Sequence, residues 1–194
     1  MNNDTKLLKK LLREEIRQKL KAMTAHERQD ESSMVCKRAI ELCSINPGSV
    51  TLAYMPLKTE CSPVEFFEHV HENGGYVAFP RCEENGELTL YIPNDAEAWE
   101  KNGYGIMEPI PSKSKLVWPD ELNLIIVPAL GYDHYCGRMG RGGGFYDRLL
   151  SKTTAYKLGI CFSCQFLECI PFEPHDEYVD CVITGNGNVY YKNS

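Results

Sequence analysis

Residues 137–148, with the sequence GRMGRGGGFYDR, combine five glycines, three arginines and one aspartate in twelve positions. A glycine in regular structure costs about 0.5–1 kcal/mol relative to alanine, so such a cluster indicates a place where bare backbone must approach a ligand closely. Arg138 and Arg141 can bind phosphate oxygens with two hydrogen bonds each. Asp147 can offer Mg²⁺ one carboxylate. The stretch therefore predicts a phosphate-binding loop.

The common glycine-rich phosphate motifs do not describe this loop. G-x-x-x-x-G-K-[ST] is absent, and no G-x-G-x-x-G opens a helix directly after a strand. The shared physics still applies, because inward-facing amides followed by a helix start near residue 145 favour an anion. Two other interpretations remain open, a flexible surface loop and an RNA-binding segment of the Arg-Gly-Gly kind.

Composition limits the classes of protein to consider. The chain has 194 residues, 43% hydrophobic and 25% charged, which are ordinary values for one globular domain spanning residues 1–194. Its net charge of −6 argues against a general affinity for nucleic acid or anionic membranes. No segment approaches eighteen apolar residues and the N-terminal segment lacks an apolar signal region, so a cytoplasmic location is expected.

Nine cysteines raise the question of metal or redox chemistry. Only Cys161 and Cys164 form a C-x-x-C, and no second pair stands at zinc-finger spacing. An odd number without a signal peptide predicts reduced thiols, packed as small apolar residues. Zinc or redox function is the alternative.

The elements that must position the loop follow from hydrophobic periodicity. Apolar residues at three- and four-residue steps predict a helix ending near Ala22, and Thr24 with Glu27 predicts a capping box that begins a second helix. Ser62 and Pro63 predict the start of a third. Strands are expected at 50–54, 76–80, 88–92, 122–130 and 156–162, and a closing hairpin turns at 185–188.

Helices alternating with strands predict an α/β fold, a Rossmann-like three-layer α/β/α sandwich around a mostly parallel sheet. The segment 122–130 is apolar enough to be a central strand buried on both faces. In such sheets, ligands bind beyond the carboxyl ends of the strands. The glycine-rich loop leaves that end of the central strand, which is where a ligand is expected.

The longer stretch LIIVPALGYDHYCGRMGRGGGFYDRLL resembles the signature of the 5-formyltetrahydrofolate cyclo-ligase family, also called 5,10-methenyltetrahydrofolate synthetases. It departs from the family pattern at Met139, usually leucine, and at Phe145, more often tyrosine. The resemblance implies conversion of 5-formyltetrahydrofolate, with ATP and Mg²⁺, to 5,10-methenyltetrahydrofolate, ADP and phosphate. The folate, which can carry a polyglutamate tail, and ATP would be the only partners of a monomeric enzyme.

The resemblance also implies roles for residues across the chain. Arg138 and Arg141 would be catalytic, and Met55 and Glu60 would contact the folate together with residues 141–145. Asp147 and Asp180 would hold the metal. The nucleotide would be bound by Lys9, Arg13, Arg138, Met139, Gly140, Arg141, Gly142, Gly143, Gly144, Phe145 and Tyr146.

Weaker candidates and rival functions stay open. Arg81 and Tyr104 are candidate ligand contacts, whereas Glu108, His175 and Asp176 are expected to be structural. One rival is another phosphoryl-dependent or sugar-phosphate enzyme on a related α/β scaffold, since fold alone does not fix the substrate. The other is a non-catalytic nucleotide- or RNA-binding module.

Overall fold

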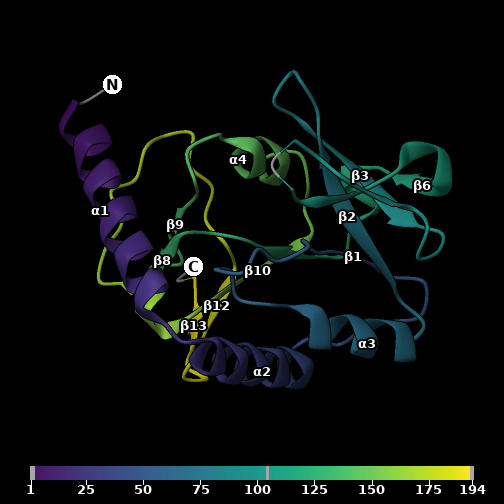
Figure 1. The fold of residues 1–194 in the computed structure, drawn as a ribbon, viewed down its shortest axis with the longest axis horizontal. Helices are drawn as coiled ribbons and strands as arrows, with labels where there is room; N and C mark the ends of the chain where they lie inside the picture. Colours follow the sequence, from purple (N-terminus) through teal and green to yellow (C-terminus); the bar gives the residue numbers. More distant parts are fainter. Residues whose placement is uncertain (1–2, 104, 193–194) are drawn as a thin grey trace.

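The computed structural model describes residues 3–103 and 105–192. Its main sheet has the order β13-β12-β10-β7-β1-β2-β3-β6 (Figure 1). The strands are β1 (Val50–Leu52), β2 (Tyr76–Cys82), β3 (Leu88–Pro93), β6 (Ser114–Val117), β7 (Leu124–Val127), β10 (Tyr156–Cys161), β12 (Cys181–Thr184) and β13 (Val189–Tyr191). The five inner neighbours from β12 to β2 pair in parallel, and β13, β3 and β6 add antiparallel pairs at the two edges.

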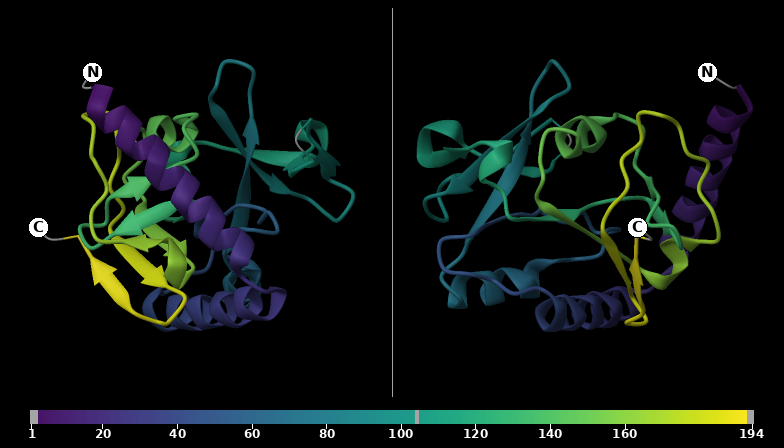
Figure 2. Two further views of the ribbon diagram at one scale, coloured as in Figure 1. Left: turned by 60° about the vertical axis from the view of Figure 1, so that its left-hand side comes forward. Right: turned by 180° about the vertical axis from the view of Figure 1, so that it is seen from behind.

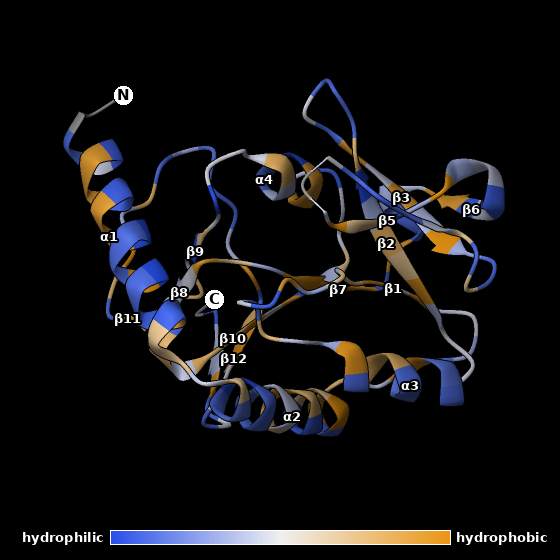
Figure 3. Ribbon diagram, in the orientation of Figure 1, coloured by the Kyte–Doolittle hydropathy of each residue, from blue (hydrophilic) through white to orange (hydrophobic). Residues whose placement is uncertain are grey.

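Strand β7 lies at the centre of the sheet, as its apolar sequence predicts. All four of its residues are buried. Leu124 and Ile126 face one core cluster, while Ile125 and Val127 face the other, because successive side chains of a strand point to opposite faces. Figure 3 shows the hydrophobic colour concentrated on the central strands.

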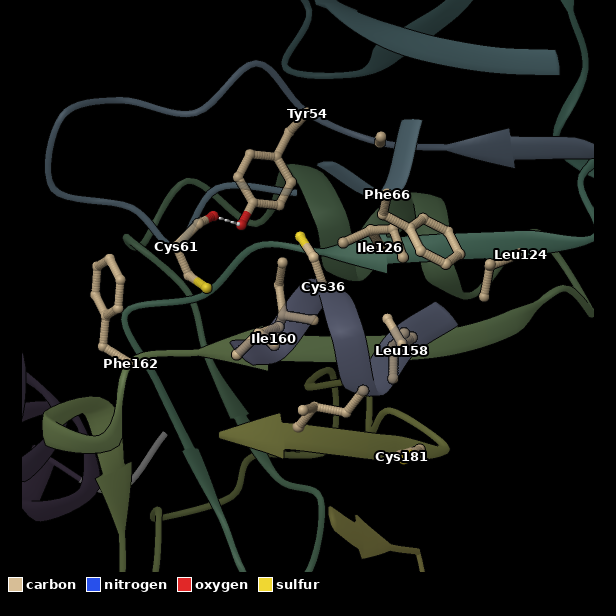
Figure 4. Packing of buried hydrophobic residues seen from close by; sticks show 14 of the residues in the cluster. Cys36, Tyr54, Cys61, Phe66, Leu124, Ile126, Leu158, Ile160, Phe162 and Cys181 are labelled. Atoms are coloured by element: carbon tan, nitrogen blue, oxygen red, sulfur yellow. Dashed lines mark hydrogen bonds between the residues drawn. The ribbon is translucent and has the colours of Figure 1, made fainter. Parts of the chain in front are cut away.

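Three helices contribute to the core on one face of the sheet: the second and third lie along that face, and the first runs past the edge of the sheet (Figure 1). They are α1 (Asn3–Ala22), α2 (Ala25–Leu42) and α3 (Val64–Glu72), and their buried residues share one core cluster with β7, β10 and β12. Figure 4 shows part of this cluster, in which Cys36 and Phe66 lie close to Ile126 and Ile160. The predicted capping box is confirmed, since the Glu27 N–H donates to Thr24 Oγ1 and the Thr24 N–H donates to Glu27 Oε2.

The opposite face carries a thinner layer. It consists of the short helix α4 (Phe145–Leu150), whose Leu149 and Leu150 are buried against the sheet, and a small sheet of order β11-β8-β9 (Figures 1 and 2). The predicted three-layer architecture is confirmed. The remaining elements are β4 (Trp99–Lys101), β5 (Met107–Pro109), β8 (Gly131–Asp133), β9 (Arg138–Met139), β11 (Phe166–Leu167) and the 3₁₀ turns η1 (Pro111–Lys113), η2 (Pro119–Glu121) and η3 (Ser163–Gln165).

The β8–β9 hairpin was not expected from the sequence, which predicts only a loop after β7. One carboxylate holds its turn: Asp133 accepts hydrogen bonds from the N–H groups of Tyr135, Gly137 and Ile170. A Cβ on Gly137 would lie 2.9 Å from both Asp133 oxygens. The first glycine of the motif therefore makes room for a structural carboxylate and not for a ligand.

All nine cysteines are free thiols. Burial raises the pKa of Cys36 and Cys43 to about 11 and that of Cys136 to about 12, so these thiols stay protonated near neutral pH. Cys164 lies with its Sγ 3.5 Å from Met23 Sδ, packed as a small apolar residue. Within the described ranges, none of the helices has the length and apolar character needed to cross a bilayer.

Candidate active site

A cavity of about 400 Å³ lies at the carboxyl ends of the parallel strands. Tyr54 follows β1, Phe79 and Pro80 lie in the second half of β2, and Pro128 follows β7; all four line the cavity. Strand ends in a parallel sheet meet at one edge, so residues far apart in sequence converge there. The volume is within the range of small-molecule sites.

The cavity has an apolar wall and a charged, glycine-rich wall. The apolar wall comprises Tyr54, Leu57, Phe79, Leu88, Ile106 and Met107. The other lining residues include Met55, Glu60, Arg138, Asp147 and residues 140–146, all predicted site residues. Such a cavity can bind a flat, largely apolar ring beside a group of anionic oxygens.

The glycine loop joins β9 to α4 and adopts a backbone that side chains disfavour. Gly142 has a φ of 108°, and Gly144, the N-cap of α4, has a φ of 69°. Gly144 offers no side-chain cap, so the first amides of α4 are left without that partner. The loop thus presents backbone to the cavity, as the motif predicts.

Arg138 and Asp147 form a buried ion pair at the base of this loop. The Arg138 side chain is 3% exposed, and its Nη2 donates to Asp147 Oδ1. Its Nη1 donates to the Pro128 carbonyl at 3.3 Å, while its Nε is buried with no partner. The hydroxyl of Tyr146 is likewise buried and unpartnered. Unsatisfied buried donors are rare in native proteins, and the two residues that carry these both line the cavity.

Arg141 lies on the solvent side of the cavity. Its Nη2 and Nε donate to Glu60 Oε1 at 2.7 and 3.2 Å, and its side chain is 50% exposed. Glu60 Oε2 accepts from the Leu57 N–H at 2.9 Å, which fixes the carboxylate. Two residues predicted to contact the substrate are thus brought together from positions 81 apart in sequence.

The structure gives Lys9 and Arg13 partners that the sequence did not predict. Lys9 is 4% exposed, and its Nζ forms ion pairs with Glu173, at 2.8 Å, and with Asp176. Arg13 Nε donates to the Gly140 carbonyl at 2.9 Å. Neither side chain lines the cavity. Two carboxylates pair with the Lys9 charge, and Arg13 binds a backbone carbonyl of the glycine loop. The phosphate contacts of both residues stay predictions.

The two predicted metal ligands lie apart. Asp180 Oδ2 accepts from the Lys157 N–H at 2.8 Å, at the amino ends of β10 and β12, whereas the cavity lies at the carboxyl ends. Asp147 lines the cavity, and its Oδ2 accepts no hydrogen bond from any residue that the structure describes. Mg²⁺ is commonly bound by one or two carboxylates plus phosphate oxygens and water. Asp147 fits such a site. The structure does not bring Asp180 to it, and the part of Asp180 in metal binding stays a prediction.

The structure places the other residues that the sequence singles out as follows. Met139 is 1% exposed in the core, because the pleat of β9 turns its side chain away from the cavity; its nucleotide contact stays a prediction. Arg81 pairs with Glu100 at 2.6 Å and does not line the cavity. Glu108 is buried and accepts from the Cys82 N–H and from Asn102. Tyr104 lies outside the described residues.

Sequence reasoning missed the apolar wall. Tyr54 and Phe79 are ordinary apolar residues by composition, and their only signal is position near the carboxyl end of a parallel strand. Burial raises the pKa of Tyr54 well above its usual value, so its hydroxyl stays protonated. It donates to the Cys61 carbonyl, as Figure 4 shows, and thereby ties the segment after β1 to the start of α3.

The Lys9 ion pairs give a pH-dependent stability. The hydrogen bond from Lys9 holds the pKa of Glu173 below its ordinary value. A carboxyl with a depressed pKa in the folded state contributes stability above its unfolded pKa, and loses it as the pH falls through the folded pKa. We expect Glu173→Gln to lower the free energy of unfolding at pH 7, and the difference from the parent to shrink below about pH 4. Urea unfolding at pH 7 and pH 3.5 measures this difference.

The matched control for that experiment is Glu15→Gln, which removes an exposed i,i+4 partner of Lys19 and should change stability little at either pH. An equal loss for Glu173→Gln at both pH values would contradict the assignment of the effect to the ion pair.

Comparisons with known proteins agree with this site. The model of the 5-formyltetrahydrofolate cyclo-ligase family matches residues 5–185. A Mycolicibacterium smegmatis protein named 5-formyltetrahydrofolate cyclo-ligase is 31% identical over 146 residues, covering 71% of this chain and 74% of that protein. A Saccharomyces cerevisiae protein of the same name is 25% identical over 214 residues, covering 94% of this chain and 98% of that protein.

A solved structure gives the same result for the fold. The NMR structure of Aquifex aeolicus 5,10-methenyltetrahydrofolate synthetase superposes with a TM-score of 0.82 at 29% sequence identity, covering 96% of this chain and 94% of that one. The match of the family model over nearly the whole chain, including the glycine loop and the strands that carry it, shows that this protein belongs to the 5-formyltetrahydrofolate cyclo-ligase family.

Proposed function

We propose that this protein converts 5-formyltetrahydrofolate to 5,10-methenyltetrahydrofolate, using ATP and releasing ADP and phosphate. The observation that carries the proposal is the cavity at the strand ends, which is lined both by apolar side chains and by a glycine loop with two arginines. The apolar wall suits the flat rings of a reduced folate. The glycine loop suits the phosphates of a nucleotide.

The difficult step is activation of the formyl oxygen, which is a poor leaving group while it belongs to an amide. Transfer of the γ-phosphoryl group forms an oxygen–phosphorus bond and releases ADP. N10 of the folate then attacks the formyl carbon, the phosphate leaves with the oxygen, and the proton of N10 is lost. Such a transfer needs in-line positioning and charge stabilisation more than a protein nucleophile.

The residues of the site suit these requirements. Arg141 reaches the mouth of the cavity and stabilises the charge that spreads over the transferred phosphoryl oxygens. Arg138, fixed by Asp147 and Pro128, lines the cavity and places its positive charge near a bound anion. The loop amides complete the set of donors.

Magnesium is part of the proposal. Asp147 would hold it through the free Oδ2, with phosphate oxygens and water as the other ligands. The ion would neutralise charge on the β- and γ-phosphates. The monomeric state, the cytoplasmic location and the use of polyglutamylated folate remain predictions from the sequence.

The test is an assay of the purified protein with 5-formyltetrahydrofolate, ATP and Mg²⁺, followed by the near-ultraviolet absorbance of the methenyl product. We expect product formation that requires ATP and stops when a chelator removes the metal. ATP hydrolysis with no methenyl product would favour another phosphoryl-transfer enzyme. Nucleotide binding with no turnover of either compound would favour a non-catalytic binding protein.

A further inference from the structure

Arg148 is the third arginine of the motif, and the proposed reaction gives it no role. It lies in α4, one turn after the glycine loop. Its Nη2 donates to the Gly143 carbonyl at 3.0 Å, and both its Nε, at 3.2 Å, and its Nη2 donate to the Gly86 carbonyl. Its guanidinium carbon lies 5.4 Å from the centre of the Phe145 ring. A surface arginine with three carbonyl hydrogen bonds and a ring contact is held in one conformation.

These contacts join two walls of the cavity. Gly86 lies in the turn between β2 and β3, the hairpin drawn beside α4 in Figure 1. The residues at the base of this hairpin, Cys82 and Leu88, line the cavity, as does Gly143. Arg148 therefore links the apolar hairpin wall to the glycine loop from outside the cavity.

The bond to Gly143 also fixes the orientation of a peptide group. The peptide that joins Gly143 to Gly144 is planar, so its C=O and N–H point in opposite directions. Because the carbonyl points to Arg148, the Gly144 N–H points away from Arg148. Two adjacent glycines resist rotation of this peptide only weakly, since neither has a Cβ. A hydrogen bond from a fixed donor supplies the missing restraint.

We propose that Arg148 is a positioning residue that holds the Gly143–Gly144 peptide so that the Gly144 N–H faces the anionic part of the ligand. Its role in turnover rests on the proposed function. The space around Arg148 agrees with this assignment, because a Cβ on Gly144 would lie 2.7 Å from Arg148 Nη1. On the other side of the loop, Arg13 holds the Gly140 carbonyl in the same way.

The chain offers a matched control. Lys152 follows α4, and its Nζ pairs with Glu87 Oε1 at 2.7 Å, which ties the same hairpin to the same helix without contacting the glycine loop. Both side chains of this pair are about half exposed. Removing the Lys152 side chain breaks only a contact between α4 and the hairpin. Removing the Arg148 side chain breaks such a contact and also the hydrogen bond to the Gly143–Gly144 peptide.

The experiment compares Arg148→Met, which keeps length and apolar contact with Phe145 but has no donor, with Lys152→Met. The first readout is the ¹H–¹⁵N spectrum of the ligand-free proteins. We expect the Gly144 amide signal to shift or broaden in Arg148→Met and to stay in place in Lys152→Met. The second readout is kinetic: KM for ATP should rise on the order of tenfold in Arg148→Met, with kcat within about threefold of the parent.

The outcomes separate the alternatives. An unchanged Gly144 amide with a raised KM would overturn the proposal in favour of direct contact between Arg148 and phosphate. Equal effects of the two substitutions would overturn it in favour of a link to the hairpin alone. The spectra are recorded without ligand, so the result for the Gly144 amide does not depend on the proposed function. Failure of the proposed function would instead appear as an absence of turnover in the parent protein.

Discussion

Replacing Arg141 with alanine should lower kcat/KM by about 30-fold to 1,000-fold, the equivalent of about 2–4 kcal/mol of transition-state stabilisation. The guanidinium lies at the mouth of the cavity, held by Glu60 at 2.7 Å, and alanine leaves no donor there. Because charge on the phosphoryl oxygens is redistributed in the transition state, the loss should appear in kcat as well as in KM. Steady-state kinetics at saturating folate and varied ATP measure both.

The control for this prediction is Arg17→Ala. Arg17 is also an exposed arginine paired with a carboxylate, but its partner is Glu14 on the same helix, three residues away. We expect kcat/KM close to the parent value for that variant. A folded Arg141→Ala protein, with unchanged thermal unfolding and unchanged kcat/KM, would contradict the assigned role.

Replacing Gly143 with valine should abolish ATP binding while leaving the core intact. A Cβ at this position would lie 2.8 Å from the ring of Phe145, and valine adds two methyl groups beyond it. The Phe145 ring, the glycine loop or both must move, and both line the cavity. Isothermal titration calorimetry with ATP and Mg²⁺ should detect no binding, and the midpoint of thermal unfolding should fall by only a few degrees, since Gly143 is exposed.

A matched valine tests whether any exposed loop glycine would give the same result. Gly103 lies between β4 and β5, and a Cβ there meets nothing within 4 Å. Gly103→Val should bind ATP as the parent does. Intact ATP binding in Gly143→Val would show that the glycine loop does not hold the nucleotide.

The central fold was predictable because its signals are local. The apolar run that became β7 and the alternation of helices with strands follow from burial patterns that each segment carries in itself. The capping residues Thr24 and Glu27 likewise act within four positions. The glycine loop was predictable because so many glycines raise the conformational entropy cost of folding, and contact between bare backbone and a ligand is a reason to keep them.

Features that depend on distant partners were not predictable. The β8–β9 hairpin depends on the carboxylate of Asp133, whose third donor, the Ile170 N–H, comes from 37 positions away. The carboxylates that pair with Lys9 are 164 and 167 positions away in the sequence. The helical pattern around Lys9 alone predicts only a charged side chain that faces solvent. The antiparallel strands β3 and β6 extend a sheet that the alternating pattern describes as parallel.

The central claim is that the amides of the glycine loop bind the terminal phosphates of ATP. The most direct test is a crystal structure of the protein with a non-hydrolysable ATP analogue and Mg²⁺. We expect oxygens of the β- or γ-phosphate within about 2.7–3.2 Å of backbone nitrogens of residues 142–144. A nucleotide bound elsewhere, with these amides facing solvent, would contradict the account.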